Sequence, residues 1–525
     1  MSFISIGFFA FFAALLLLYY LVPRRFQWML LLAASIAFYA SFGLKYLIYL
    51  GVTAVSTWAA GVRMDDLYRA QDAYLKEHKQ EMSREERKAY KARVSGRAKG
   101  VLVLCLLLNL GILAVIKYTN FALENVNAIF RTDLAYVKFA LPIGISFYMF
   151  QSLGYAIDVY RRKYPAERNL AKTALFTSFF PQLIQGPISR FDELSKSLFA
   201  EHAFDGREVT FGLWRVLWGM FKKLVIADRL APAVAALTAA DASYSGVFVP
   251  ATILFYALQI YGDFTGGIDI TIGLAQMLGV KVAENFNRPF FSKNIAEYWR
   301  RWHITMGTWF RDYIFYSMSV SPKMLKFSKW AKNRIHPEVG KRLPVYLSTI
   351  TVWLATGLWH GAAWHFIVWG MVNCVILLIS QELAPVYRKF HARFAWSNTK
   401  GWEIFMVIRT FWMMGMIRVL DVYHTPGFWA RQIASIFTTG NWGALFDGSF
   451  LKLGLDAADY LVVLVGSLVM LAVSLAKGKG PVREQLAAKP AVVRYGLIWL
   501  LIAATVIFGA YGIGYDAAQF IYVQF

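Results

Sequence analysis

The chain has 525 residues, of which 58% are hydrophobic and 17% are charged, with a mean hydropathy of +0.45. Soluble proteins carry about a quarter charged residues, so this composition excludes a soluble globular protein and is typical of a polytopic membrane protein. The 55 Lys and Arg against 32 Asp and Glu give a net charge of +23, which in a membrane protein indicates basic cytoplasmic loops rather than nucleic-acid binding. Cys105 and Cys374 lie singly in apolar runs and provide neither a disulfide framework nor a thiolate metal site.

The first apolar run, residues 3–22, is followed by Pro23, Arg24 and Arg25, and no basic residue precedes it. This order is the reverse of a cleavable signal peptide. We therefore expect the run to remain as a span with its N-terminus outside, followed by apolar runs at 26–42 and 46–61.

The segment 62–100 differs in character, because eleven basic and seven acidic residues lie between Arg63 and Lys99, with apolar residues such as Leu67, Tyr74 and Leu75 among them. The pattern indicates a cytoplasmic basic amphipathic segment that lies on the inner leaflet. A solvated charged hairpin without lipid contact is an equal alternative.

Further apolar runs bring the expected total to about 10–12 transmembrane or re-entrant helices at ~20 residues per span. They lie at 101–116, 139–159, 173–188, 209–227, 247–280, 345–383, 402–420, 458–476 and 494–514. Basic clusters at Arg161–Lys163, Lys323–Arg342 and Lys477–Arg483 indicate cytoplasmic faces. The last run then points outward and places the C-terminal tail, residues 515–525, on the external side. With no internal repeat and no soluble domain between spans, we expect one membrane domain over residues 1–525.

Histidine is the most informative polar residue at membrane depth, because its pKa of ~6.5 allows proton transfer near neutrality. Five of the eight histidines are in charged or loop-like stretches and are interpreted as structural or solvated: His78, His202, His336, His391 and His424. His360 and His365 lie in a long apolar stretch, with Gly357 and Gly361 beside His360. A metal pair is disfavoured, because five residues on one helix would place the two rings about 140° apart. A buried histidine bound to a neighbouring carbonyl is an alternative for His360.

The segment 281–345 contains a second dense polar stretch, which we interpret as re-entrant or cytoplasmic. Between Trp299 and Tyr313 lie three Trp, three Arg and His303. Such a composition is tolerated at membrane depth only where it lines a protein cavity or an aqueous funnel. An interfacial aromatic belt with snorkelling arginines is the alternative. The sequence has no Gly-x-Ser-x-Gly, phosphate-loop or His-Glu-x-x-His motif, so serine-hydrolase, nucleotide-driven and zinc-protease functions have no support.

At these residues the sequence resembles the membrane-bound O-acyltransferase superfamily, in its bacterial branch of alginate O-acetylation and teichoic-acid D-alanylation proteins. Motifs in matching order carry the resemblance: Leu141-Pro-Ile-Gly-Ile-Ser-Phe-Tyr148, Asp158-Val-Tyr-Arg161, Phe179-Phe-Pro-Gln-Leu-Ile-Gln-Gly-Pro187, Asp263-Phe264, Asn285-Phe-Asn287, Trp299-Arg-Arg-Trp-His-Ile304, Trp309-Phe-Arg-Asp-Tyr313 and Gly357-Leu-Trp-His-Gly361. The Pro-Gln-Leu-Ile-Gln-Gly-Pro stretch and the chain length place the alginate-type acetylases closer. The resemblance implies an all-α polytopic protein whose tilted helices form a ring around a central funnel.

The resemblance further implies that His360 is the family's essential histidine and that His303 occupies its second position, which is often Asn in other branches. Trp302, Trp359, Arg311 and Asp312 lie in the same motifs and are expected to bind substrate. His365 matches no family position, and no metal is expected.

The final residues, Phe520-Ile-Tyr-Val-Gln-Phe525, resemble the Phe-x-Tyr-x-x-Phe C-terminal motif of this branch. The family's proposal that this tyrosine carries the acyl group makes Tyr522 the third candidate catalytic residue; a simple interfacial anchor is the alternative. A phenol, with a pKa of ~10, is nearly as good a leaving group as a thiol of pKa ~8.5, so an aryl ester retains much of a thioester's transfer potential. His360 would then act as general base.

By resemblance, the expected function is movement of an acyl group, most simply acetyl, from a cytoplasmic thioester donor across the bacterial plasma (inner) membrane to an extracellular polysaccharide. The donor would be acetyl-CoA or an acyl-carrier-protein thioester, with no bound cofactor. The expected partners are an extracytoplasmic esterase-like acyltransferase of the SGNH type, the polysaccharide and membrane lipid, without nucleic acid. The basic residues Lys323, Lys326, Lys329, Lys332 and Arg334 would attract an anionic donor, although topology alone also explains them.

Two other functions are alternatives. A transporter or flippase also has many spans with intramembrane His and Arg, but the sequence shows neither an inverted repeat nor an intramembrane acidic chain for ion coupling. An enzyme that acylates a membrane lipid or protein is the second alternative, and the C-terminal tyrosine motif argues against it.

Overall fold

The computed structural model describes residues 2–239, 244–511 and 520, and those residues form helices and connecting segments without a β-strand. Five helices in this part of the chain are long and apolar enough to cross a membrane: α3 (Tyr46–Glu77), α4 (Arg84–Phe130), α17 (Trp364–Glu382), α21 (Ala457–Lys477) and α23 (Ala491–Phe508). The protein is therefore an all-α polytopic membrane protein, as its composition predicts. The expected number of spans and their ring arrangement stay predictions.

The chain divides into two compact units, which we describe separately. Unit 1 contains Met1–Gly212 and Leu274–Ala283. Besides α3 and α4 it holds α1 (Ile6–Leu21), α2 (Gln27–Ala40), α5 (Ile145–Tyr160), α6 (Leu170–Ser178), α7 (Phe180–Leu183) and α8 (Phe191–Leu198).

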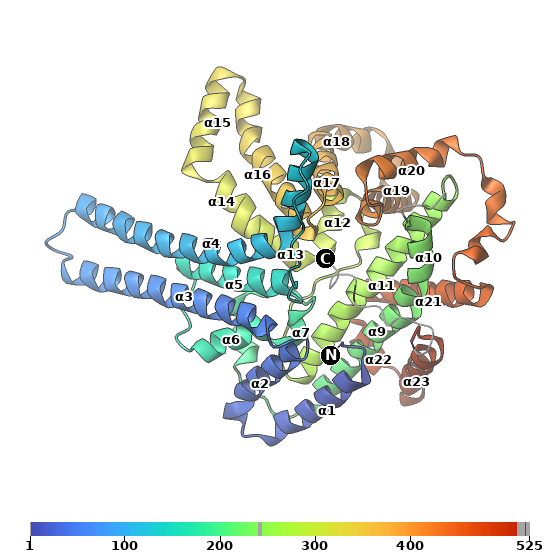
Figure 1. Cartoon of the computed structure of the whole chain (residues 1–525), viewed down its shortest axis with the longest axis horizontal. Helices are drawn as coiled ribbons and strands as arrows, with labels where there is room; N and C mark the ends of the chain where they lie inside the picture. Colours follow the sequence, from blue (N-terminus) through green and yellow to red (C-terminus); the bar gives the residue numbers. More distant parts are fainter. Residues whose placement is uncertain (1, 240–243, 512–519, 521–525) are drawn as a thin grey trace. The chain divides into compact units, whose positions relative to one another are not determined.

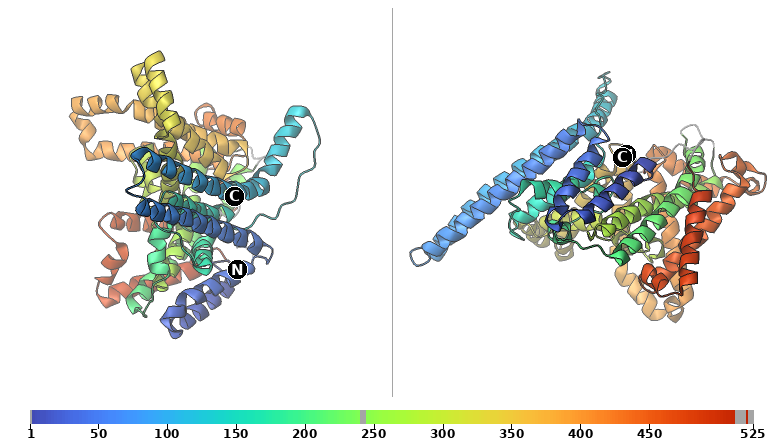
Figure 2. Two further views of the ribbon diagram at one scale, coloured as in Figure 1. Left: turned by 90° about the vertical axis from the view of Figure 1, so that its left-hand side faces the viewer. Right: turned by 90° about the horizontal axis from the view of Figure 1, so that it is seen from below.

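Within unit 1, α3 and α4 lie side by side as a long helical hairpin (Figures 1 and 2). The charged segment 62–100 forms the end of this hairpin, where a turn joins the polar half of α3 to the polar start of α4. Ser83 caps α4: its hydroxyl accepts a hydrogen bond from the Glu86 amide (3.1 Å), and the Glu86 carboxylate accepts one from the Ser83 amide (2.8 Å). Because 47 helical residues extend about 70 Å and the hydrocarbon core is about 30 Å thick, the charged end of α4 projects beyond the bilayer.

The apolar run 173–188 does not form one helix. It folds as the end of α6, the single turn of α7 and a buried bend, because Pro181 has no amide hydrogen to continue a helix. The Gln182 side chain closes the bend by donating to the Pro187 carbonyl (2.9 Å) and to the Ser189 hydroxyl (2.5 Å). The Pro-Gln-Leu-Ile-Gln-Gly-Pro motif is therefore a structural element inside unit 1.

Unit 2 contains Leu213–Gly273 and the residues from Glu284 onward. Its long elements are the second half of α9 (Gly206–Phe221), the π-helical segment η2 (Lys222–Ala227), α10 (Asp228–Thr238), α11 (Phe248–Met277) except its last turn, α15 (Pro322–Arg334), α16 (Pro337–His360), α17, α19 (Lys400–Arg418), α20 (Pro426–Thr438), α21 and α23. Shorter elements connect them: η3 (Pro289–Phe291), α12 (Ile295–Arg301), α13 (Ile304–Phe310), η4 (Arg311–Phe315), α14 (Tyr316–Ser319), α18 (Ala384–Arg393), η5 (Ala395–Asn398), η6 (Val419–Asp421), η7 (Trp442–Leu445), η8 (Ser449–Lys452) and α22 (Val482–Ala487).

Glycines allow α11 to contact the α9–η2 helix backbone to backbone. A Cβ on Gly219 would lie 2.5 Å from the Gly266 carbonyl oxygen, and one on Gly262 would lie 2.8 Å from that of Lys222. Gly262 and Gly266 form a Gly-x-x-x-Gly spacing, which permits close approach of membrane helices. This contact brings the charged residues of η2 within reach of those on α11.

Candidate active site

His303 lies between the short helices α12 and α13 with its backbone in the left-handed region, at φ +47°. A residue with a Cβ adopts this conformation only where its surroundings impose it. Here Asn285 holds the next two residues: its carbonyl accepts from the Ile304 amide (3.0 Å), and its side-chain oxygen accepts from the Thr305 amide and hydroxyl (both 3.0 Å). Asn285 therefore fixes the direction in which His303 points.

The His303 side chain is fully buried, with its ring 5.0 Å from the Phe264 ring and 5.7 Å from the Trp359 ring. The helices α12 and α13 have seven residues each, too few to span a membrane. Burial and, secondarily, the positive charge of Arg418 lower the pKa of His303, so its imidazole is neutral at physiological pH.

His360 is the last residue of α16 and is also buried, with its ring 4.5 Å from the Trp369 ring and 5.1 Å from the Trp359 ring. The run 345–383 is thus two helices, because the chain becomes extended at Gly361 and α17 starts at Trp364. His365 belongs to the second helix. The prediction that His360 and His365 lie on one helix, with their rings about 140° apart, is therefore wrong.

Close packing of α16 on α17 positions this helix end. A Cβ on Gly357 would lie 2.6 Å from the Phe366 carbonyl oxygen, and one on Gly370 would lie 2.5 Å from that of Trp353. Since neither position tolerates a larger residue without displacement of a backbone, the two glycines fix the separation of the helices one turn before His360.

Trp359 is the residue that joins the two histidines, because its ring lies next to both the His303 and the His360 imidazoles. Residues 57 positions apart in the sequence are thereby collected in one buried group, which we call the His–Trp–His cluster: His303, Trp359 and His360. The structure brings together three predicted site residues, whose catalytic and binding roles stay predictions.

Trp302 directly precedes His303 in the chain, and its side chain is buried, with 1% of its surface exposed. Its ring stacks on Tyr298 at 5.7 Å, and the Arg418 guanidinium carbon lies 4.6 Å from its ring centroid. Arg418 is itself buried and donates to the Tyr298 hydroxyl and to Asp421, both at 3.3 Å. Arg418 was not among the predicted site residues, although an arginine in the apolar run 402–420 is the kind of signal that marks a functional or structural site.

Arg311 and Asp312 begin the π-helical segment η4, and the Arg311 guanidinium donates to the Asp312 carboxylate at 2.8 Å. Half of the Arg311 side chain is exposed, in contrast to the buried His–Trp–His cluster. Their predicted role in substrate binding stays a prediction. Tyr522 lies outside the described residues. Phe520 is described: it is buried, with the Lys223 ammonium 4.9 Å from its ring centroid.

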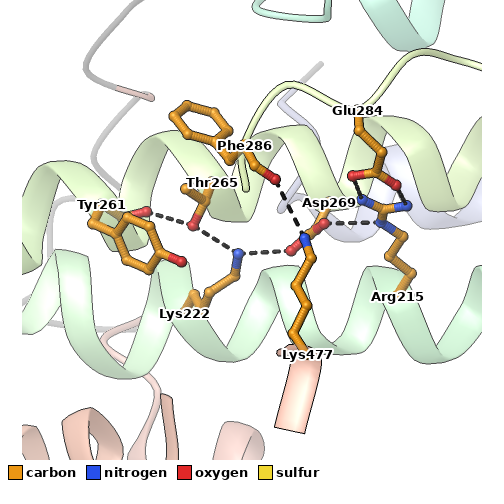
Figure 3. A network of polar contacts seen from close by, with 8 residues as sticks. All are labelled: Arg215, Lys222, Tyr261, Thr265, Asp269, Glu284, Phe286 and Lys477. Atoms are coloured by element: carbon orange, nitrogen blue, oxygen red, sulfur yellow. Dashed lines mark hydrogen bonds and ion pairs between the residues drawn. The ribbon is translucent and has the colours of Figure 1, made fainter. Parts of the chain in front are cut away.

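Figure 3 shows a buried charge network between η2 and α11. Asp269 accepts from Lys222 (2.7 Å) and from Arg215 Nε (2.8 Å), and the two Arg215 terminal nitrogens pair with both Glu284 oxygens (2.6 and 2.7 Å). Lys222 also donates to the Thr265 hydroxyl at 2.7 Å. A second group pairs Lys223 with Asp228 (2.6 Å) and Asp263 (2.7 Å).

The expected absence of an intramembrane acidic chain for ion coupling stays a prediction, although the apolar run 247–280 holds two acidic residues. Asp263 and Asp269 lie on α11, and each is paired with a lysine of η2. The sequence contains a signal for these ion pairs, because two adjacent lysines lie in the apolar run 209–227 and two aspartates lie in the apolar run 247–280.

The network also supports the active-site segment. Glu284 and Phe286 flank Asn285, and each is held: Glu284 by Arg215, and the Phe286 carbonyl by the Lys477 ammonium at 3.3 Å (Figure 3). The residue that orients His303 is thus flanked by two anchored neighbours, one held by the buried Arg215 and the other by the exposed Lys477.

The fold and this site describe a multi-pass membrane protein with two buried histidines joined by a tryptophan. The family model described as MBOAT, membrane-bound O-acyltransferase family, matches residues 164–326 and 325–420 and includes both histidines. A probable alginate O-acetylase of Azotobacter vinelandii is 34% identical over 443 residues, 81% of this chain and 75% of that protein. A peptidoglycan O-acetyltransferase of Helicobacter pylori is 32% identical over 349 residues, 61% and 62% of the two chains. A teichoic acid D-alanyltransferase of Bacillus subtilis is 25% identical over 278 residues, 51% and 64% of the two chains.

The chain therefore belongs to the membrane-bound O-acyltransferase family, and it is an acyltransferase. The predicted family is confirmed, including the greater likeness to alginate-type acetylases than to D-alanyl transferases.

Proposed function

We propose that this enzyme moves an acetyl group from a cytoplasmic thioester across the bacterial plasma membrane for O-acylation of an extracellular polysaccharide. The observation that carries the proposal is the buried His–Trp–His cluster, in which the Trp359 ring lies next to the imidazoles of both His303 and His360. The polysaccharide is proposed from the relatives named as alginate and peptidoglycan O-acetylating enzymes.

His360 is the general base of the proposed reaction, and His303 orients it or binds the developing oxyanion. His360 removes the phenolic proton of Tyr522 while the phenolic oxygen attacks the thioester carbonyl. The carbon–sulfur bond then breaks, the thiol leaves with a proton, and Tyr522 carries an aryl ester. Because a phenol is a good leaving group, the ester remains reactive toward a second acceptor.

The position of Phe520 supports a tail that returns to the protein. Phe520 lies two residues before Tyr522, and its ring is buried over the Lys223 ammonium in unit 2.

The donor is acetyl-CoA or an acetylated carrier protein. The acceptor of the tyrosine ester is an extracytoplasmic esterase-like partner of the SGNH type, whose serine passes the acetyl group to the polysaccharide. Acylation of a membrane lipid or protein would need no external partner and is the competing outcome.

Mass spectrometry of the purified enzyme, incubated in proteoliposomes with isotope-labelled donor, tests the relay. We expect labelled acetyl on Tyr522 in the wild type, none in His360→Ala or Tyr522→Phe, and undiminished label in the matched controls His365→Ala and Tyr511→Phe. If Tyr522→Phe retains full polymer acylation while His360→Ala abolishes it, the relay is wrong and the acyl group is transferred directly. Label on a lipid, with none on Tyr522, would show that the acceptor is a lipid and not a polysaccharide.

A further inference from the structure

The helix α15 is the most strongly basic helix surface in unit 2. Its thirteen residues include Lys323, Lys326, Lys329, Lys332 and Arg334 and contain no acidic residue. In Figure 1 it packs as a hairpin arm against the N-terminal half of α16. All five cations are exposed to solvent.

The side of α15 that faces α16 is fixed by packing. Met324 and Ala331 are buried, and the Ser328 hydroxyl donates to the Gly340 carbonyl at 2.6 Å. A Cβ on Gly340 would lie 2.6 Å from the Lys332 Cα, so the two backbones are in contact. The opposite side of α15 therefore has a defined orientation and points away from α16.

One exposed side of α15, next to the side that faces α16, combines cations with exposed aromatic rings. Phe327 and Trp330 are 43% and 51% exposed, and their rings stack at 5.5 Å with an interplanar angle of 11°. At about 100° per residue, Lys323, Lys326 and Arg334 all lie within about 40° of Trp330 around the helix, and Phe327 lies about 60° away. We call these five residues the basic-aromatic face; Lys329 and Lys332 lie about 100° or more from Trp330 and are outside it.

We infer that the basic-aromatic face binds anionic phospholipid headgroups at the membrane boundary. Lysine and arginine side chains match the charge of lipid phosphates, and tryptophan and phenylalanine favour the boundary between headgroups and acyl chains. A surface that exposes large apolar and cationic side chains together fits a lipid interface better than water.

The distance from the active site argues against a donor-binding role for this face. Twenty residues of α16 separate Gly340, which contacts α15, from His360, a rise of about 30 Å. The basic-aromatic face and the His–Trp–His cluster are therefore most of a helix length apart. The inference thus concerns a site separate from the proposed acyl-transfer chemistry.

Native mass spectrometry of the full-length enzyme, titrated in detergent with phosphatidylglycerol or phosphatidylcholine, tests the inference. We expect the wild type to retain phosphatidylglycerol preferentially. Lys323→Gln with Lys326→Gln should weaken that binding roughly tenfold to thirtyfold, with little effect on phosphatidylcholine. The matched control, Lys329→Gln with Lys332→Gln, removes the same charge outside the face and should retain wild-type binding.

Equal loss in the two double variants, or no preference of the wild type for phosphatidylglycerol, would overturn the inference. Lys326→Gln alone provides a second, smaller perturbation that should reduce binding in the same direction. Donor docking is distinguished by kinetics in uncharged micelles: if Lys323→Gln with Lys326→Gln raises KM for acetyl-CoA or the acetylated carrier protein while phosphatidylglycerol retention is unchanged, the face binds the donor and not lipid.

Discussion

The buried pair between Lys222 and Asp269 allows a quantitative test of the network in Figure 3. Asp269→Asn removes the negative charge that faces Lys222, whose side chain is 3% exposed, and leaves that ammonium with the Thr265 hydroxyl. Removal of one partner of a buried ion pair destabilises a protein by about 3–5 kcal/mol. We expect a loss near the lower end, about 3 kcal/mol, because Arg215 keeps its two bonds to Glu284.

The double variant Lys222→Met with Asp269→Asn removes both charges. The asparagine oxygen can still accept from Arg215, and Arg215 remains neutralised by Glu284. Since replacing a whole buried pair by uncharged groups is often neutral, we expect the double variant to recover most of the lost stability. Equilibrium unfolding of the purified protein in mixed detergent micelles measures the free energies.

The control for this test is Asp312→Asn, which disrupts the partly exposed pair with Arg311 and should change the free energy of unfolding by no more than about 1 kcal/mol. The reasoning is refuted if Asp269→Asn is as stable as that control, or if the double variant is no more stable than Asp269→Asn alone.

Three further variants test the geometry around the His–Trp–His cluster. Gly357→Ala should separate α16 from α17 and strongly reduce acyl transfer. The control Gly496→Ala adds a Cβ that would meet no atom within 4 Å and should retain full activity. Equal activities of the two variants would contradict the inference that Gly357 fixes the separation of these helices. Asn285→Ala removes the two hydrogen bonds that its side chain accepts from Thr305, so it should lower the free energy of unfolding by roughly 1–3 kcal/mol and should also lower kcat. An unchanged kcat would show that other contacts hold His303 in its left-handed conformation. Arg418→Lys keeps the positive charge but loses the planar guanidinium that lies over the Trp302 ring, so initial-rate assays should show reduced acyl transfer. A wild-type rate would show that the reaction does not need this guanidinium.

Much of the class and site could be read from sequence because the relevant signals are local. The two apolar runs near the C-terminus appear as α21 and α23, since the length of an apolar run is decided by its own residues. The motifs around His303 and His360 were recognised for the same reason. Helix breaks were harder: in the run 345–383, Gly361 interrupts a stretch whose hydropathy is continuous.

The sequence by itself determined that this is a polytopic membrane protein of the O-acyltransferase family and which histidines belong to its motifs, because those properties reside in composition and in short contiguous segments. Only the tertiary structure decided that Trp359 lies between His303 and His360, and that Asp269 faces Lys222 rather than lipid. These relations depend on helix packing at glycines such as Gly266, where two backbones distant in sequence come into contact. A buried charge is stable only where such a contact supplies its partner, and no segment of the chain contains that information alone.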